Sequence, residues 1–296
     1  MDKGKQLFIG IDGGGTKCQA RLENAQGELL GEGLSGSANP ARDSQVAKQS
    51  ILTSSLLALQ QAGLGEDDFS RSSVVLGLAG VNIPKYRLLI EEWQHPFANM
   101  YLTTDLHIAC LGAHGGNDGG IIISGTGSSA FSVVRGKHTI VGGHGFPLGD
   151  KGSGAWLGWQ ALVYTLESLD KMRIPSGLTE HIAQHFNAHS ATDIVGHALK
   201  FAPAEYAQFA PLVLKFYEQA DANAVLIVGE AVGYLEHLIQ RVNHTQPPRI
   251  AMIGTIAKRL CGYFNAQTQT LLSTPLCSPE TGAVQLARTL FKKKSS

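Results

Sequence analysis

The hydrophobic and polar positions of this chain follow two periods, and their alternation predicts a mixed α/β protein. Short apolar runs bounded by glycine predict buried strands, as at residues 7–11, 73–79, 121–123 and 249–253. Apolar residues at helical spacing predict helices at residues 43–61, 85–93, 105–111, 153–169, 178–186, 204–220, 222–242 and 281–291. The first third therefore reads as three meandering strands followed by strand, helix, strand and helix, a mixed sheet flanked by helices.

Two segments share one plan, in which a buried strand, a turn rich in Gly, Ser and Thr, and a returning strand follow each other. The first passes through Asp12-Gly13-Gly14-Gly15-Thr16-Lys17 and the second through Ser124-Gly125-Thr126-Gly127-Ser128-Ser129. We call residues 12–17 the first Gly-rich turn and residues 124–129 the second Gly-rich turn. Backbone N–H groups in such turns form concavities that bind anions. Two opposed turns would clamp a polyphosphate.

The first Gly-rich turn differs from two better-known phosphate loops. A Walker A loop and a dinucleotide-binding turn both open a helix, whereas a strand follows here. Taken alone, the segment could be an ordinary hairpin with an Asp turn residue. The second Gly-rich turn, in the same setting, favours the phosphate-binding interpretation.

Length and composition are typical of a folded protein with two domains. The chain has 296 residues, of which 43% are hydrophobic and 16% charged, enough for a sizeable core. Lys plus Arg and Asp plus Glu each total 24, so the net charge is zero. This balance gives no support to nucleic acid or an anionic membrane as a partner. A Gly-rich joint at residues 115–118 marks the expected boundary between the halves.

Cysteine usage and the N-terminal sequence predict a cytoplasmic protein. The cysteines form no C-x-x-C pair and no Cys/His cluster with zinc-ligand spacing; they are Cys18, Cys110, Cys261 and Cys277. Free thiols in a reducing compartment are the simplest interpretation. The N-terminus has no apolar segment of signal-peptide length, and no apolar run approaches the roughly 18 residues that span a bilayer.

Asp105 is a candidate catalytic base. It follows the predicted strand 100–104 and stands at the start of a helix, where open α/β sheets place their ligands. A carboxylate there can accept the proton of a sugar hydroxyl as the oxygen attacks phosphorus. A helix N-cap is the alternative role, and the two roles are compatible.

Two loops carry candidate ligands for a polyol. The many glycines of residues 142–154 precede one amphipathic helix and predict a loop folded tightly around something small. In it, Asp150 could accept hydrogen bonds from a polyol or be only a turn or capping residue. His144 could contact a ligand or simply pack in the loop. Asn39 could bond a hydroxyl or an amide, or could form a turn before Pro40.

These motifs together resemble the acetate and sugar kinase, heat-shock chaperone and actin superfamily over essentially the whole chain. Within it, the chain is similar to the N-acetylglucosamine kinase and bacterial glucosamine kinase branch of the BadF/BadG/BcrA/BcrD-type ATPases. The two Gly-rich turns resemble the family's two phosphate motifs, and the most specific match is Gly149-Asp150-Lys151-Gly152-Ser153-Gly154.

The resemblance implies an α/β fold of two actin-like (ribonuclease H-like) domains, with mixed sheets flanked by helices and with ATP and sugar in the interdomain cleft. The N-terminal domain would cover residues 1–116 and the C-terminal domain residues 117–280. The C-terminal helix 281–296 would pack back on the first domain.

The resemblance also implies roles for single residues. ATP and its phosphates would be bound by Gly13, Gly14, Gly15, Thr16, Lys17, Gly125, Thr126, Gly127 and Gly254. Asp12 would hold Mg²⁺ through water, and Asp105 would be the catalytic base. The sugar would be bound by Asn39, Asp105, Gly143, His144 and Asp150. The chain departs from the family in having Gly254-Thr255 where two glycines are usual, and His144 where an aromatic residue is frequent.

The implied activity is the ATP- and Mg²⁺-dependent phosphorylation of the 6-hydroxyl of glucosamine or N-acetylglucosamine by a homodimer. Two alternatives stay open. An ATPase activator of a redox enzyme, of the benzoyl-CoA reductase activator type, needs cysteines that hold an iron–sulfur cluster between subunits. A nucleotide-switched binding module would bind ATP without sugar-stimulated turnover.

Overall fold

The computed structural model describes residues 6–291, which divide into two compact units. The first unit contains the residues up to 119 and those from 274 onward, and the second contains residues 120–273. The boundaries expected from the sequence were 116/117 and 280/281. The lysine run 292–294 and the end of the predicted helix 281–296 lie outside the described residues.

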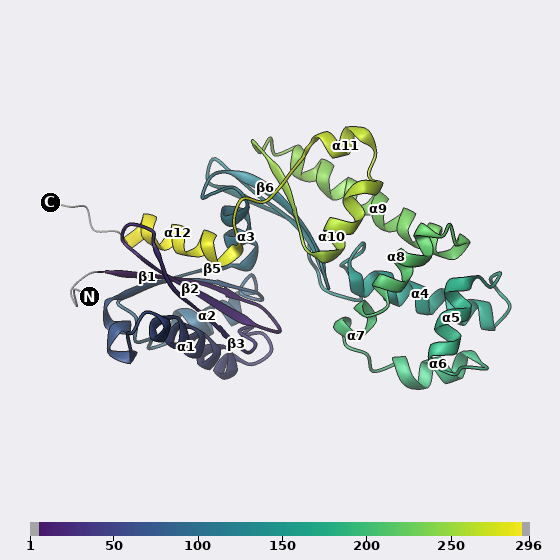
Figure 1. Ribbon diagram of the computed structural model, residues 1–296, viewed down its shortest axis with the longest axis horizontal. Helices are drawn as coiled ribbons and strands as arrows, with labels where there is room; N and C mark the ends of the chain where they lie inside the picture. Colours follow the sequence, from purple (N-terminus) through teal and green to yellow (C-terminus); the bar gives the residue numbers. More distant parts are fainter. Residues whose placement is uncertain (1–5, 292–296) are drawn as a thin grey trace. The chain divides into compact units, whose positions relative to one another are not determined.

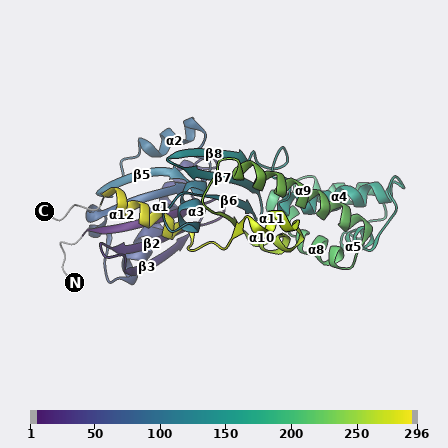
Figure 2. The same ribbon diagram turned by 90° about the horizontal axis from the view of Figure 1, so that it is seen from above.

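The first unit is a five-stranded mixed sheet with helices on both faces (Figure 1). Its strands run in the order β3-β2-β1-β4-β5, so that β3 and β5 form the two edges (Figure 2). β1 pairs antiparallel with β2 and parallel with β4. Its elements are β1 (Leu7–Gly13), β2 (Cys18–Asn24), β3 (Leu29–Ser35), α1 (Ser44–Gln61), the 3₁₀ helix η1 (Glu66–Arg71), β4 (Ser72–Leu78), α2 (Pro84–Glu91), β5 (Asn99–Thr104), α3 (Asp105–Ala113) and α12 (Pro279–Phe291).

The central strand β1 is apolar from Leu7 to Ile11 because helices cover both faces of its sheet. Successive side chains of a strand point to opposite faces. Ile9 and Ile11 pack in the cluster that contains Ile51 of α1, whereas Phe8 packs with Val284 of α12 on the other face. A fully buried strand of this kind carries no alternation, which is why its short apolar run stood out in the sequence.

The C-terminal helix α12 packs closely on the first unit through glycines. A Cβ atom at Gly10 of β1 would collide with the backbone of Glu280 and Val284, and one at Gly282 would collide with the backbone of α3. The missing side chains let the backbones approach each other. This packing places the first turn of α12 against the strand that ends in the first Gly-rich turn.

The second unit repeats the strand order of the first. Its sheet has the order β10-β9-β6-β7-β8, so β6 to β10 take the places of β1 to β5. β7 pairs antiparallel with β8, while β6 pairs parallel with β9 and β9 with β10. The Gly-rich turns are therefore equivalent, since each joins the central strand of a sheet to the next strand. The predicted mixed sheets flanked by helices are confirmed.

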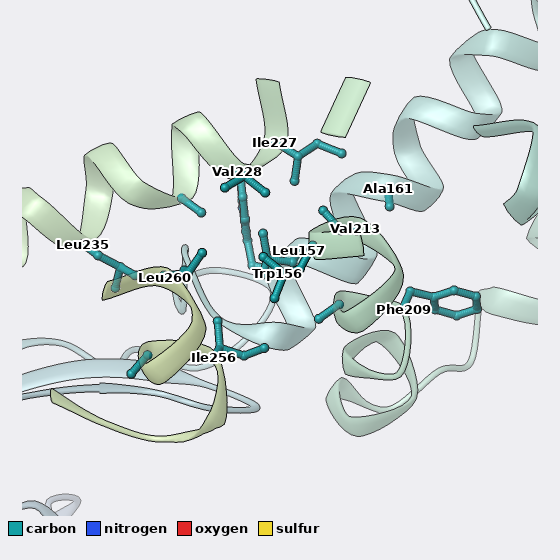
Figure 3. Close-up of a cluster of buried hydrophobic side chains, with 14 of the residues drawn as sticks. Trp156, Leu157, Ala161, Phe209, Val213, Ile227, Val228, Leu235, Ile256 and Leu260 are labelled. Atoms are coloured by element: carbon teal, nitrogen blue, oxygen red, sulfur yellow. The ribbon is translucent and has the colours of Figure 1, made fainter. Parts of the chain in front are cut away.

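The elements of the second unit are β6 (Gly119–Ser124), β7 (Ser128–Val134), β8 (Lys137–Gly142), α4 (Gly154–Leu169), α5 (Gly177–His185), α6 (Ala191–Ala198), α7 (Pro203–Ala207), α8 (Ala210–Glu218), α9 (Ala222–Asn243), β9 (Ile250–Ile253), α10 (Thr255–Leu260), the 3₁₀ helix η2 (Cys261–Tyr263), α11 (Ala266–Thr270) and β10 (Leu272–Ser273). The helices bury one continuous apolar cluster. Figure 3 shows Trp156 and Leu157 of α4 beside Val228 of α9 and Ile256 of α10. This packing holds the N-terminus of α4 in place beside the sheet.

One helix prediction for the second unit is wrong, and one helix was missed. The predicted helix 204–220 is two helices, α7 and α8, and the second has Pro211 in its first turn. Proline lacks an N–H, so it fits the first turn of a helix, where no intrahelical bond is required, and not the interior of a longer helix. Helix α6 was not predicted, although Ser190 and Asp193 form a capping box at its start.

Helix α9 is the one described helix that is long and apolar enough to cross a membrane by length and composition. Half of its most apolar window is buried inside the protein, where it packs in the cluster with α4, α8 and α10. We therefore assign it as a core helix.

Candidate active site

The first Gly-rich turn is held from behind by its carbonyl groups. The N–H of Gly14 donates to the carbonyl of Lys17 (2.9 Å) and closes the turn. The carbonyl of Gly14 accepts from the N–H of Ala38 (2.9 Å), and that of Gly15 accepts from Nη1 of Arg42 (3.0 Å).

The N–H groups on the other side of this turn are unused. Among residues 6–291, no acceptor is bonded to the backbone N–H of Gly15 or Thr16. The side chains of Thr16 and Lys17 are exposed. Successive backbone N–H groups that face outward from a turn form a concavity that can bind an anion.

The second Gly-rich turn has the same arrangement in the second unit. The N–H of Gly125 donates to the carbonyl of Gly127 (3.0 Å). The first two N–H groups of α4 hold the turn from behind, because Gly154 donates to Gly125 (2.7 Å) and Ala155 donates to Thr126 (3.2 Å). Within the described part of the chain, the N–H groups of Thr126 and Gly127 again donate to nothing.

Gly254 lies directly against the second Gly-rich turn. It follows β9, has a φ of 114° and caps α10. A Cβ atom at this position would collide with the carbonyl of Ser124. This single glycine therefore allows α10 to start beside the turn, at the position where the family resemblance implies an ATP contact.

Asp12 and Asp105 lie at the carboxyl edge of the first sheet. Asp12 is in register with Gly77 of β4, and Gly77 with Thr103 of β5, while Asp105 begins the helix that follows β5. Burial, then the charges of Asp105 and Glu280, raise the pKa of Asp12 to about 7. Burial also raises the pKa of Asp105, against the Leu106 N–H that donates to it at 2.9 Å. The edge is thus a concentration of poorly solvated negative charge.

Glu280 is a member of this cluster that sequence reasoning missed. It lies in the first turn of α12, is only 6% exposed, and its Oε1 accepts from Nε2 of Gln19 at 3.3 Å. Gln19 faces Asp12 across the β1–β2 ladder and accepts from Nζ of Lys17 at 3.1 Å. A glutamate at the start of the last helix carries no sequence signal, because only the packing of α12 on β1 brings it to Asp12.

Asp105 is not the N-cap of its helix, which corrects one of its two predicted roles. Thr104 is the N-cap, and its Oγ1 accepts from the N–H of His107 at 3.2 Å. Asp105 is the first helical residue and is half-buried. Its Oδ1 accepts from the N–H of Leu106 at 2.9 Å, which holds the carboxylate at the start of α3 without making it the N-cap.

Asn39 lies beside the first Gly-rich turn in the first unit. Its Oδ1 accepts from the N–H of Ala41 at 2.9 Å, so it forms the expected turn before the helix α1. Its side-chain nitrogen bonds no residue between 6 and 291, which leaves donors for a ligand oxygen. Both interpretations of Asn39 from the sequence therefore stay compatible.

Asp150 joins the loop 142–154 to the second Gly-rich turn. It is half-buried with a φ of 64°, and its Oδ1 accepts from the N–H of Gly145 at 3.3 Å. A Cβ atom at Gly127 would lie 2.6 Å from its Oδ2. Burial raises the pKa of Asp150, opposed first by hydrogen bonds from the backbones of Gly145 and Ser128. It is a turn residue and not a cap, because Ser153 caps α4.

Gly143 and His144 belong to the same loop. Gly143 has a φ of 70°, and a Cβ atom there would lie 2.9 Å from Cβ of Ser129. His144 is exposed, and its backbone and Cβ lie beside Gly149. The second unit thus brings Gly125, Thr126, Gly127, Gly143, His144, Asp150 and Gly254 into one region, and the first unit does so for Asp12 to Lys17, Asn39 and Asp105.

Comparison with known proteins decides the family. Residues 9–276 match the BadF/BadG/BcrA/BcrD ATPase family. The chain belongs to this family. It is 36% identical over 280 residues to glucosamine kinase GspK of Vibrio cholerae, covering 95% of each protein. It is 29% identical to an N-acetyl-D-glucosamine kinase of Dictyostelium discoideum, covering 96% of the chain and 98% of that protein.

The fold comparison agrees with the family assignment. The crystal structure of a candidate N-acetylglucosamine kinase from Chromobacterium violaceum superposes with a TM-score of 0.88 at 30% identity, covering 96% of this chain and 99% of that one. The resemblance to the BadF/BadG/BcrA/BcrD ATPases inferred from the two Gly-rich turns is therefore confirmed.

Proposed function

We propose that this BadF/BadG/BcrA/BcrD family member is an ATP-dependent amino-sugar kinase that phosphorylates the 6-hydroxyl of glucosamine or N-acetylglucosamine. The relatives that match over nearly their whole length are kinases of these two sugars. The observation that carries the proposal is the pair of equivalent turns, each presenting two free N–H groups. We infer that each turn binds phosphate oxygens of ATP.

Asp105 is the proposed catalytic base. Its carboxylate accepts the proton of the sugar hydroxyl as the oxygen attacks the γ-phosphorus, and ADP leaves. Its burial raises its pKa, which makes it a stronger base than an exposed aspartate, provided that it is ionised. Removal of a general base typically costs about 10²–10⁴-fold in rate.

The first unit also fits Mg²⁺, the expected companion of ATP. The charges of Asp105 and Glu280 add to burial in raising the cost of ionising Asp12 at this edge, and a divalent cation would relieve that cost. Among the described residues, no group of three His, Cys, Asp or Glu side chains is arranged to bind a metal directly. We therefore assign Asp12 to hold the ion through water, where the ion would neutralise phosphate charge.

The proposed sugar ligands lie in two loops. Asn39 offers its side-chain N–H groups, and Asp150 offers a carboxylate beside His144 and Gly143. A carboxylate pairs better with an ammonium group than with an acetamido group. Together with the 36% identical relative, Asp150 favours glucosamine as the acceptor.

The test is ADP release with ATP and Mg²⁺ in the presence of glucosamine, N-acetylglucosamine, glucose or N-acetylmannosamine. Strong stimulation by one amino sugar, lost in Asp105→Asn, supports the proposal and names the substrate. If no sugar in this panel stimulates turnover, the amino-sugar assignment is wrong. The homodimer stays a prediction, which sedimentation velocity tests directly.

A further inference from the structure

We propose that Arg42 is a positioning residue that orients the Thr16 N–H of the first Gly-rich turn toward the bound phosphate. The inference rests on the proposed phosphate-binding role of this turn. Nothing in the sequence distinguished Arg42, because it lies in the loop before α1, 27 residues from the carbonyl group that it contacts.

The argument starts from the geometry of the peptide bond. In a trans peptide, the carbonyl of one residue and the N–H of the next lie in one plane and point in opposite directions. A donor that binds the carbonyl from one side therefore fixes the N–H on the other side. Each Gly-rich turn has two such peptides, which are 14–15 and 15–16 in the first turn and 125–126 and 126–127 in the second.

Backbone donors hold three of these four peptides. Ala38 binds the carbonyl of Gly14, while Gly154 and Ala155 bind those of Gly125 and Thr126. The fourth is held by a side chain, since Nη1 of Arg42 donates to the carbonyl of Gly15 at 3.0 Å. Arg42 thus does for the first turn what the second N–H of α4 does for the second turn.

Arg42 is itself well fixed for this role. Its N–H donates to the carbonyl of Asn39 at 3.1 Å, and the next residue, Asp43, caps α1 through the N–H groups of Gln45 and Val46. A Cβ atom at Gly15 would lie 3.4 Å from Cζ of the arginine, so the guanidinium lies directly on the turn.

No ion pair competes for the guanidinium. Within residues 6–291, no carboxylate lies within salt-bridge distance of Arg42, although the side chain is exposed. An exposed arginine whose one acceptor is a backbone carbonyl of a turn is placed to order that turn. A charge-assisted donor also polarises the peptide and makes its N–H a better donor to phosphate.

The decisive experiment compares Arg42→Ala, Arg42→Lys and the control Arg241→Ala in the full-length protein. Arg241 is an exposed arginine near the end of α9 in the second unit. We expect kcat/KM for ATP to fall about 10-fold to 100-fold in Arg42→Ala, the cost of one charge-assisted hydrogen bond. The KM for the sugar stays within about twofold, and Arg42→Lys, which keeps a donor, falls only about threefold.

A second readout separates positioning from direct contact with substrate. In the ligand-free ¹⁵N-labelled protein, Arg42→Ala should lower the order parameters of the Gly15 and Thr16 amides from about 0.85 toward 0.6, and Arg241→Ala should not. If the activity falls but these amides stay rigid, Arg42 acts on the substrate and the inference is overturned. It is also overturned if Arg42→Ala keeps wild-type kcat/KM.

The two proposals fail in different ways. If no amino sugar stimulates turnover, the proposed function fails, but ADP affinity measured by calorimetry and the amide order parameters still test Arg42. If the sugar is phosphorylated and the Arg42 variants behave as wild type, only the positioning role is lost.

Discussion

Replacing Asp12 by Asn should stabilise the folded protein at alkaline pH while it abolishes activity. Burial and the charges of Asp105 and Glu280 raise the pKa of Asp12 from its usual 3.8 to about 7. A carboxyl with a raised pKa binds its proton more tightly in the folded chain than in the unfolded one. The protonated Asp12 carboxyl therefore contributes fully to the free energy of unfolding below about pH 3.8. This contribution declines as the pH rises to about 7 and is lost above that pH.

The magnitude follows from this pKa difference. A rise from 3.8 to about 7 corresponds to ~4 kcal/mol, at 1.36 kcal/mol per pH unit. An Asn side chain resembles the protonated carboxyl but cannot ionise. The free energy of unfolding of Asp12→Asn should therefore exceed that of the wild type by about 1.5 kcal/mol at pH 5 and by about 4 kcal/mol at pH 8.5.

The assay is urea unfolding with EDTA present at both pH values, because a bound cation would stabilise the wild type. Asp67→Asn, at an exposed position of the first unit, controls for the loss of one charge and should show no such pH dependence. A variant that is less stable than wild type at pH 8.5, or whose advantage does not grow with pH, would refute the reasoning. The same carboxylate lowers stability and serves the proposed site, as functional residues commonly do.

Three further substitutions test other parts of the site. Asp105→Asn should lower kcat about 10²–10⁴-fold. In the wild type, kcat should fall as the pH is lowered, and this fall should begin above the usual pKa of Asp because burial raises the pKa of Asp105. A pH–rate profile without that fall at acid pH would contradict the role of Asp105 as base. Gly254→Ala should destabilise the protein by roughly 2 kcal/mol, because the position has a positive φ and the new Cβ atom would collide with the second Gly-rich turn. Gly233 is a helical glycine with open space around it, so the control Gly233→Ala should stabilise the protein by about 0.5–1 kcal/mol. Chemical denaturation of both variants tests the prediction. Gly127→Ala should displace the Asp150 carboxylate, which would lie 2.6 Å from the new Cβ atom, and should raise the KM for the sugar at least about tenfold. An unchanged KM would show that Asp150 does not bind the sugar.

Sequence reasoning located the elements whose signals are local. The buried strands β1, β4, β6 and β9 appeared as short apolar runs with glycine nearby, because a strand covered on both faces has no polar side. Both Gly-rich turns were found for a similar reason, since a tight turn that presents its backbone to an anion admits few side chains. Asp105 was found because the end of a strand and the start of a helix are both visible in sequence.

Other elements were missed because their signals are weak or were overridden locally. Helix α6 has apolar residues at helical spacing, Ala191, Ile194, Val195 and Ala198, but it spans only eight residues, and a pattern of about two turns is a weak signal. The helix predicted at 204–220 was broken by Pro211, whose effect on the backbone outweighs the apolar spacing around it. These errors did not change the description of the candidate site, although Ala207 of α7 packs against Gly154 beside the second Gly-rich turn.

The contacts that complete the candidate site were decided only by tertiary structure. Glu280 reaches Asp12 because the glycines of β1 and α12 let that helix pack closely on the sheet. Arg42 reaches the carbonyl of Gly15, and Asp150 reaches Gly127, across sequence separations of 27 and 23 residues. The sequence alone determined most of the strands, turns and helices, since those preferences act between near neighbours. Which charges then meet depends on how the helices pack on the two sheets, and no local pattern in the chain records it.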